Sequence, residues 1–144
     1  MLVGSAFRYS GEGALSPLGL WELWDKFEIQ NSEMIGWWAA VEDGPAALPV
    51  TTSARDFLAT VYVQRHKPKP ASLIVLADWS DDLSNRSKTL SVTCDWTALG
   101  LSPNTTKLYV PLVEPFQTEN VGVFSIDHVF TISATQGGLL LIAK

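Results

Sequence analysis

The stretch from Ser16 to Glu42 constrains the fold of this chain more than any other, because a short amphipathic pattern runs there into an aromatic-rich one. Pro17 suits the first position of a helix, and the serine before it can cap that helix. Apolar side chains then recur at helical spacing, at Leu20, Trp24 and Phe27. A helix of about three turns is not stable alone in water. Its apolar face must therefore cover either the rest of this chain or a domain outside it.

The remainder of the chain has the alternating pattern of β-strands. Within Phe57–Arg65 the residues predicted to share one face are Phe57, Ala59, Val61 and Val63. Ser72–Trp79 is apolar on both faces, which predicts a central strand covered on both sides, and a turn over Lys67–Pro70 joins it to the strand before. Further strands are predicted at Lys88–Asp95, Lys107–Val113, Gly122–Ile126, His128–Ser133 and Gly138–Ala143, with a single helical turn over Asp95–Gly100.

Short strands of this number, roughly seven or eight, separated by turns are typical of an antiparallel sandwich. The predicted fold is therefore mostly β: an antiparallel two-sheet β-sandwich with one short N-terminal α-helix. We divide the chain into a glycine-rich N-terminal segment (1–15), the amphipathic helix and junction (16–30) and the β-sandwich domain (31–144).

The helix and the strand after it resemble a known junction. In a family of uncharacterised glycoside-hydrolase-like proteins, a TIM-barrel-type domain ends in a helix that leads into a C-terminal β-sandwich, through a sequence close to W-x-x-W-D-x-F-x-I-x-x-x-E-M-I-G-[YW]-W. This chain matches that pattern at Trp21, Trp24, Asp25, Phe27, Ile29, Glu33, Met34, Ile35, Gly36, Trp37 and Trp38. Looser similarity continues over Ala59–Tyr62, Leu76–Trp79, Asp95–Leu101 and Gly138–Ile142. The barrel, which would carry the catalytic carboxylates of such a family, has no counterpart here.

The resemblance implies a non-catalytic accessory β-sandwich whose partner is the missing barrel domain or another protein chain. The chain is 47% hydrophobic and only 17% charged, which fits a domain that covers a neighbour as well as its own interior. Two alternatives from other classes stay open. One is a stand-alone carbohydrate-binding module, and the other is a structural protein that assembles with itself through its apolar surplus.

Charge and hydropathy exclude other partners. A net charge of −5 argues against nucleic-acid binding, and we interpret the one basic cluster, Arg65–Pro70, as a solvated hairpin turn. No apolar run is long enough to span a membrane. Two N-x-[ST] sequons, at Asn85 and Asn104, lie in polar, turn-like stretches where a glycan fits. They favour a secreted or extracellular protein.

The sequence offers little catalytic chemistry. His66, His128 and the single Cys94 have no metal-ligand spacing, so we predict neither a metal nor a cofactor, and Cys94 is interpreted as a buried core thiol. Asp81-Asp82 is interpreted as a solvated turn. Glu33 opens an apolar strand, where it can pair with a cation of a neighbouring domain or line a site. No catalytic residue is assigned.

Tryptophan carries the one functional signal. Trp37 and Trp38 are consecutive on a predicted strand and should face opposite sides of the sheet, so one of them lies outside the core. Trp79 and Trp96 each follow an aspartate and are interpreted as rim residues at the ends of the sandwich. The candidate carbohydrate-binding residues are Trp37, Trp38 and Trp79. Packing within the fold is the alternative for each of them.

The helix tryptophans predict an interface. Trp21, Trp24 and Phe27, together with the strand that follows, present more aromatic surface than one short seam is expected to bury. We therefore expect an exposed apolar patch of several hundred square ångströms around the helix and residues 1–15, larger than a monomer normally tolerates.

Overall fold

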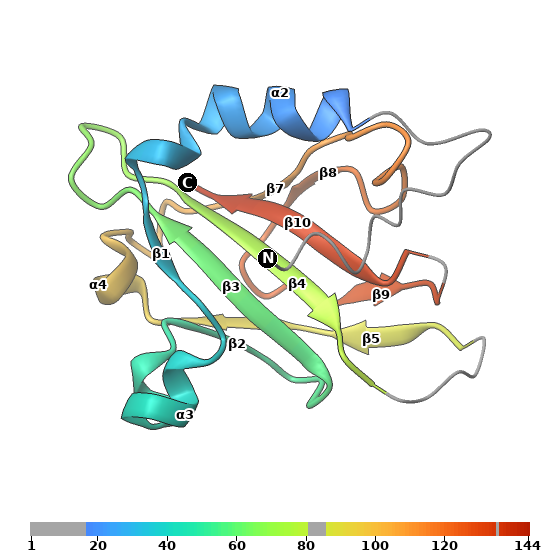
Figure 1. Ribbon diagram of the computed structural model, residues 1–144, viewed down its shortest axis with the longest axis horizontal. Helices are drawn as coiled ribbons and strands as arrows, with labels where there is room; N and C mark the ends of the chain where they lie inside the picture. Colours follow the sequence, from blue (N-terminus) through green and yellow to red (C-terminus); the bar gives the residue numbers. More distant parts are fainter. Residues whose placement is uncertain (1–16, 81–85, 135) are drawn as a thin grey trace.

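A six-stranded antiparallel sheet dominates the computed structural model, which describes residues 17–80, 86–134 and 136–144 (Figure 1). The strand order is β1-β3-β4-β10-β7-β8. The strands run over Glu33–Ile35 (β1), Phe57–Val63 (β3), Ser72–Asp78 (β4), Gly138–Ala143 (β10), Leu108–Val110 (β7) and Gly122–Phe124 (β8). The two longest, β3 and β4, pair along their whole length, from Phe57 opposite Asp78 to Val63 opposite Ser72. The hairpin between them is the turn predicted over Lys67–Pro70.

Two small antiparallel sheets accompany the large one. β2 (Val50–Thr52) pairs with β6 (Val92–Cys94), and β5 (Lys88–Leu90) pairs with β9 (Phe130–Ile132). The single strand predicted over Lys88–Asp95 is thus divided at Ser91. The backbone N–H of Ser91 donates to the Ser53 hydroxyl (2.9 Å), and its carbonyl accepts from the Ser53 N–H (3.0 Å). This contact continues the β2–β6 pairing by one residue, and the residues before Ser91 pair with β9 instead.

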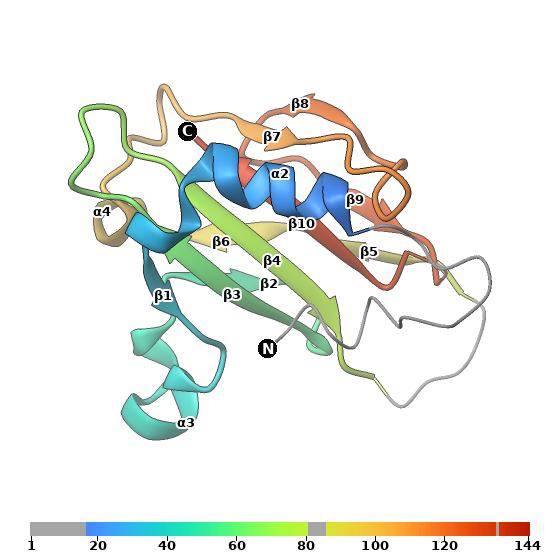
Figure 2. The same cartoon turned by 45° about the horizontal axis from the view of Figure 1, so that its top comes forward.

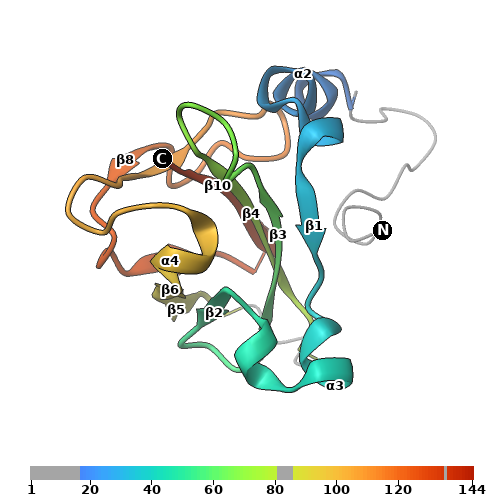
Figure 3. The same ribbon diagram turned by 90° about the vertical axis from the view of Figure 1, so that its left-hand side faces the viewer.

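One face of the large sheet shares a single core with both small sheets. The face predicted for β3 is confirmed, because its four apolar residues are all buried in this core. Figure 3 shows β2, β5 and β6 together on one side of β3 and β4. The side chains with the least exposure here come from all three sheets: Val50, Val61, Ile74, Leu76, Leu90, Phe130, Ile132 and Leu141.

Helix α2 (Leu18–Phe27) packs against the other face of the sheet and crosses β4 and β10 (Figure 2). Its Leu20 forms a second core with Val75 of β4, Leu140 of β10 and Val113. β4 therefore has a core on each face, as its continuous apolar sequence predicted. The helix ends at Glu28, whose left-handed backbone (φ 57°) leads through the short 3₁₀ turn η1 (Ile29–Asn31) into β1. The fold is mostly β with one N-terminal helix, as predicted, and of the two targets left open for that helix the sheet of this chain is the one it covers.

The prediction that Trp37 and Trp38 lie on a strand is wrong. β1 ends at Ile35, and the chain turns through Trp37 and Trp38 into the short helix α3 (Ala39–Asp43) and the 3₁₀ turn η2 (Pro45–Ala47). The Ala39 N–H donates to the Gly36 carbonyl at 3.0 Å, which closes the turn. Two adjacent indoles are apolar enough to continue a strand pattern, but the alanines after them favour a helical turn.

The single helical turn predicted after the β6 strand is confirmed. It is α4 (Trp96–Leu99), and its N-cap Asp95 accepts a hydrogen bond from the Ala98 N–H at 3.1 Å. Gly100 ends it with a left-handed backbone (φ 71°).

A buried glutamine replaces a missing strand partner beside helix α2. β10 pairs with β7 over Ile142 and Ala143, while the backbone of Leu140 bonds instead to the side chain of Gln117. The Gln117 amide donates to the carbonyls of Leu140 (2.9 Å) and Pro111 (2.8 Å), and its oxygen accepts from the Leu140 N–H (2.8 Å). Gln117 thereby fixes residues 111–117 against the sheet, next to the helix.

We expect Gln117→Ala to lower the free energy of unfolding by about 3 kcal/mol, because three buried backbone groups would lose their partner. Urea denaturation followed by circular dichroism measures the change. The matched control is Gln30→Ala, at an exposed glutamine, which should change stability by less than about 0.5 kcal/mol. Equal effects of the two substitutions would show that the Gln117 bridge contributes nothing.

Candidate functional site

The junction between α2 and β1 is fastened to the β3–β4 hairpin by a buried side chain. Gln64, only 6% exposed, directs its amide nitrogen at the last carbonyls of the helix. It donates to the carbonyl of Phe27 and lies 3.4 Å from that of Glu28. Because the carbonyls at a helix end have no partner within the helix, this amide acts as a side-chain cap supplied by the sheet.

Two ion pairs border the same junction. The Nη1 of Arg65 lies 3.3 Å from the Oε2 of Glu33, and Lys67 Nζ pairs with Glu28. The predicted interpretation of the basic cluster as a hairpin turn is confirmed, and two of its cations meet the acidic residues of the junction. Glu33 therefore has a cation of its own chain as its partner. All four side chains are at least one-third exposed, so each pair adds modest stability.

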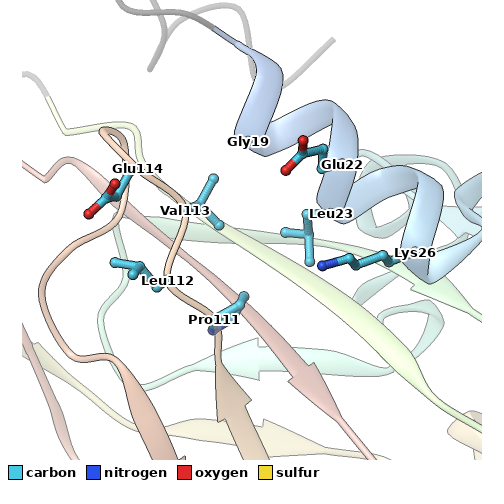
Figure 4. A pocket seen from close by; sticks show the side chains of 8 residues that line it. All are labelled: Gly19, Glu22, Leu23, Lys26, Pro111, Leu112, Val113 and Glu114. Carbon is cyan, nitrogen blue, oxygen red and sulfur yellow. The ribbon is translucent and has the colours of Figure 1, made fainter.

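A groove separates α2 from the loop before Gln117. Figure 4 shows its lining, which comes from one side of the helix and from residues 111–114, around a hollow of about 340 Å³. The helix approaches closely at Gly19, where a Cβ would lie 2.9 Å from the Glu114 carbonyl oxygen. The walls are Leu23, Pro111, Leu112 and Val113, with Glu22, Lys26 and Glu114 as charged residues.

The three predicted interface residues occupy different environments. Phe27 is buried, at 8% exposed, and Trp24 is half-buried against the second core. Trp21 is 54% exposed on a side of α2 that does not line the groove, and Leu112 on the loop wall of the groove is 56% exposed. The exposed apolar surface of this region therefore consists of Trp21 and its surroundings rather than the whole aromatic set. Residues 1–15, the other part of the predicted patch, lie outside the described residues.

The three candidate carbohydrate-binding tryptophans meet at one corner of the molecule, which we call the tryptophan corner (Trp37, Trp38 and Trp79). The ring centroids of Trp37 and Trp79 are 5.8 Å apart with an angle of 49° between the rings. Trp38 meets Trp37 edge-on at 6.1 Å. Trp79 is 49% exposed, while the other two are half-buried. Trp96 lies elsewhere, partly buried against the first core.

Asp78, the residue before Trp79, takes part in a separate polar contact. Lys88 Nζ lies 2.9 and 3.1 Å from its two carboxylate oxygens, and Ser80 N–H donates to it at 2.9 Å. Burial alone would raise the pKa of Asp78, but the hydrogen bonds from Ser80 and Lys88 outweigh it and lower that pKa. This carboxylate is held in an ion pair.

The remaining candidates are isolated. Asn104 is exposed in a turn, while Asn85 and Asp81-Asp82 lie outside the described residues. In the part of the chain that the structure describes, no three His, Cys, Asp or Glu side chains gather as metal ligands would.

We expect Gln64→Ala to lower the free energy of unfolding by about 1–2 kcal/mol, because helix carbonyls would lose a buried donor. Lys67→Ala, which removes a neighbouring but exposed contact, is the control and should cost less than about 1 kcal/mol. Thermal unfolding of both variants measures the difference. A larger loss in Lys67→Ala than in Gln64→Ala would contradict the capping role of Gln64.

Burial raises the pKa of the Cys94 thiol to about 12. In the folded protein at pH 8.5 we expect Ellman's reagent to react slowly with Cys94. In about 8 M urea, which unfolds the chain, the same thiol should react at once.

The same pKa predicts a pH dependence of stability. Because the thiol of the unfolded state loses its proton near about pH 8.5, the free energy of unfolding should fall as pH rises from about 8.5 towards the folded pKa. Cys94→Ala should remove that part of the pH dependence. Rapid labelling of the native protein would contradict the prediction.

Residues 16–143 match the family described as Glycoside hydrolase 123, C-terminal domain. No curated protein and no solved structure matches the chain. Across the described residues, no helix has the length and apolar character needed to cross a membrane. The match confirms the resemblance found at the junction, and a C-terminal domain so described implies a catalytic domain in the proteins that carry it. This chain belongs to the glycoside hydrolase 123 family, as its C-terminal domain.

Proposed function

We propose that this domain is a non-catalytic accessory domain that packs against a glycoside hydrolase 123 catalytic domain through the outer side of α2 and the groove beside it. The observation that carries the proposal is the exposure of two large apolar side chains in this region: Trp21 on α2 is 54% exposed, and Leu112 on the loop wall of the groove is 56% exposed. Large apolar side chains left in water in this way are typical of a contact surface.

The helix has apolar residues on two sides, and only one of them serves the fold of this chain. Leu20 and Phe27 point into the protein and are buried. Trp21 adds little to the stability of the isolated domain, since half of its surface stays in water. Covering that half on association would contribute about 1–2 kcal/mol. The edge of the groove carries charges of both signs, from Glu22, Lys26 and Glu114. Such an edge suits a partner whose contact surface has polar residues around its border.

Catalysis is assigned to the partner in this proposal. A glycosidase needs two carboxyl groups facing the same scissile bond. Here Glu28, Glu33 and Asp78 each lie in an ion pair with a lysine or arginine of the same chain. Such pairing gives these carboxylates a structural role within this chain.

Two further expectations belong to the same proposal. We treat the fold as a two-layer β-sandwich in which the two small sheets together form the second layer, since both share the first core with the large sheet. The sequons at Asn85 and Asn104 support a secreted or extracellular location, and Asn104 is exposed as a glycan acceptor needs.

The test is association of the 144-residue chain with a separately purified glycoside hydrolase 123 catalytic domain, measured by isothermal titration calorimetry. We expect binding, and about a tenfold weaker Kd for Trp21→Ala because of the lost apolar contact. Leu112→Asp should weaken it further by placing a charge in the interface.

Trp79→Ala is the matched control, because Trp79 is exposed to a similar extent but lies at the tryptophan corner. It should leave this Kd unchanged. Absence of association, an unchanged Kd in Trp21→Ala, or hydrolysis of aryl glycosides by the 144-residue chain alone would each contradict the proposal.

A further inference from the structure

Trp79 offers a half-exposed indole at the end of β4, outside the groove and helix of the proposed docking surface. Its backbone is fixed, because the Trp79 N–H donates to the Asp56 carbonyl at 2.9 Å. Its ring packs against that of Trp37, at 5.8 Å between centroids. An exposed aromatic side chain held in this way loses little conformational freedom when a ligand covers it.

The support extends back to the main chain at Gly36. Trp38 lies so close over this glycine that a Cβ there would come within 2.3 Å of the indole ring. Trp38 in turn meets Trp37 edge-on, with 80° between the rings, and Trp37 contacts Trp79. Each ring is therefore held by the one before it. The outermost indole is oriented by packing, which is what a stacking platform requires.

The surroundings of Trp79 select the kind of ligand. Asp56, whose carbonyl accepts from the Trp79 N–H, is exposed, as is Arg55 before it, and Ser80 follows Trp79 in the chain. An apolar protein surface would leave such polar groups without partners, whereas the hydroxyl groups of a sugar can pair with them. A pyranose ring also carries a face of C–H groups that stacks on an indole.

The negative charge of the protein favours neutral sugars over anionic ones as the ligand. The helix α3, which follows directly on Trp38, ends in two exposed carboxylates, Glu42 and Asp43, and the chain carries a net charge of −5. Glu42 and Asp43 outnumber the exposed cation Arg55, so that the balance of charge disfavours uronic acids and sulfated sugars by like-charge repulsion.

We propose that Trp79, supported by Trp37, is a stacking platform for a neutral pyranose unit of a glycan. The platform rests on the tryptophan corner alone and requires no contact through α2. Its occupant is of the chemical class that a glycoside hydrolase encounters, so the domain would hold a glycan independently of the domain interface.

The test applies a glycan array of neutral oligosaccharides to the 144-residue chain, followed by isothermal titration calorimetry with each oligosaccharide that binds. We expect at least one ligand with a Kd in the micromolar to millimolar range. Loss of a single stacked indole should weaken it tenfold or more in Trp79→Ala. The Kd of Trp79→Phe, which keeps a smaller aromatic face, should lie between the Kd of the unchanged chain and that of Trp79→Ala.

Trp21→Ala is the control here, because it removes a tryptophan of similar exposure from the other surface. It should leave glycan binding unchanged, and circular dichroism should show that all variants are folded. No binding across the array, or equal weakening by Trp21→Ala and Trp79→Ala, would overturn the proposal. So would protection of Trp79 from oxidation by N-bromosuccinimide on adding the catalytic domain without glycan, since the corner would then be a protein contact. The glycan-binding results leave the association measured through Trp21 unaltered, so the two proposals fail separately.

Discussion

Burial of β4 on both faces is the constraint on which the rest of the structure depends. Every residue from Ser72 to Ala77 is buried, with Ile74 and Leu76 in one core and Val75 in the other. A strand of this kind requires a cover on each side, which the small sheets and α2 supply. Its two ends then position the two candidate surfaces. The hairpin that precedes β4 holds the helix junction through Gln64, and the residue that follows β4 is Trp79.

The helix is held by apolar burial and then oriented by polar contacts. Leu20 and Phe27, nearly fully buried, each contribute about 1.5–3 kcal/mol, which exceeds what the exposed ion pairs of the junction supply. The hydrogen bond from Gln64 fixes the orientation of the helix, because the amide reaches the last helix carbonyls only when the end of the helix is correctly placed. Trp21 takes part in neither task. Its place on a helix already anchored elsewhere is what makes it available to a partner.

The sequence was sufficient to predict an element where apolar residues follow a regular pattern along a strand, or where capping residues mark both ends of a helical turn. They predicted the inward face of β3, the doubly covered β4 and the turn of α4, where Asp95 and Gly100 mark both ends. They were wrong at Trp37 and Trp38, because apolar identity alone does not distinguish a strand from a turn. The contact between the residues of the tryptophan corner could not be predicted from local sequence either. It exists because β1 and β4 are both antiparallel to β3 and so run in the same direction, which sends the chain after Ile35 towards the edge of the sheet where β4 ends. Likewise Arg65 meets Glu33 because Glu33 pairs with Val63 in the ladder.

The separation of the two surfaces has a physical consequence for how the domain can work. Figures 1 and 3 show α2 and α3 at opposite ends of the large sheet, with the doubly buried strands between them. Groups that far apart with no common partner affect one another little. In the arrangement that we propose, a domain seated on Trp21 leaves Trp79 open to solvent. One rigid sheet can in this way hold a fixed protein contact at one end and an exposed aromatic platform at the other, without either compromising the packing that both rely on.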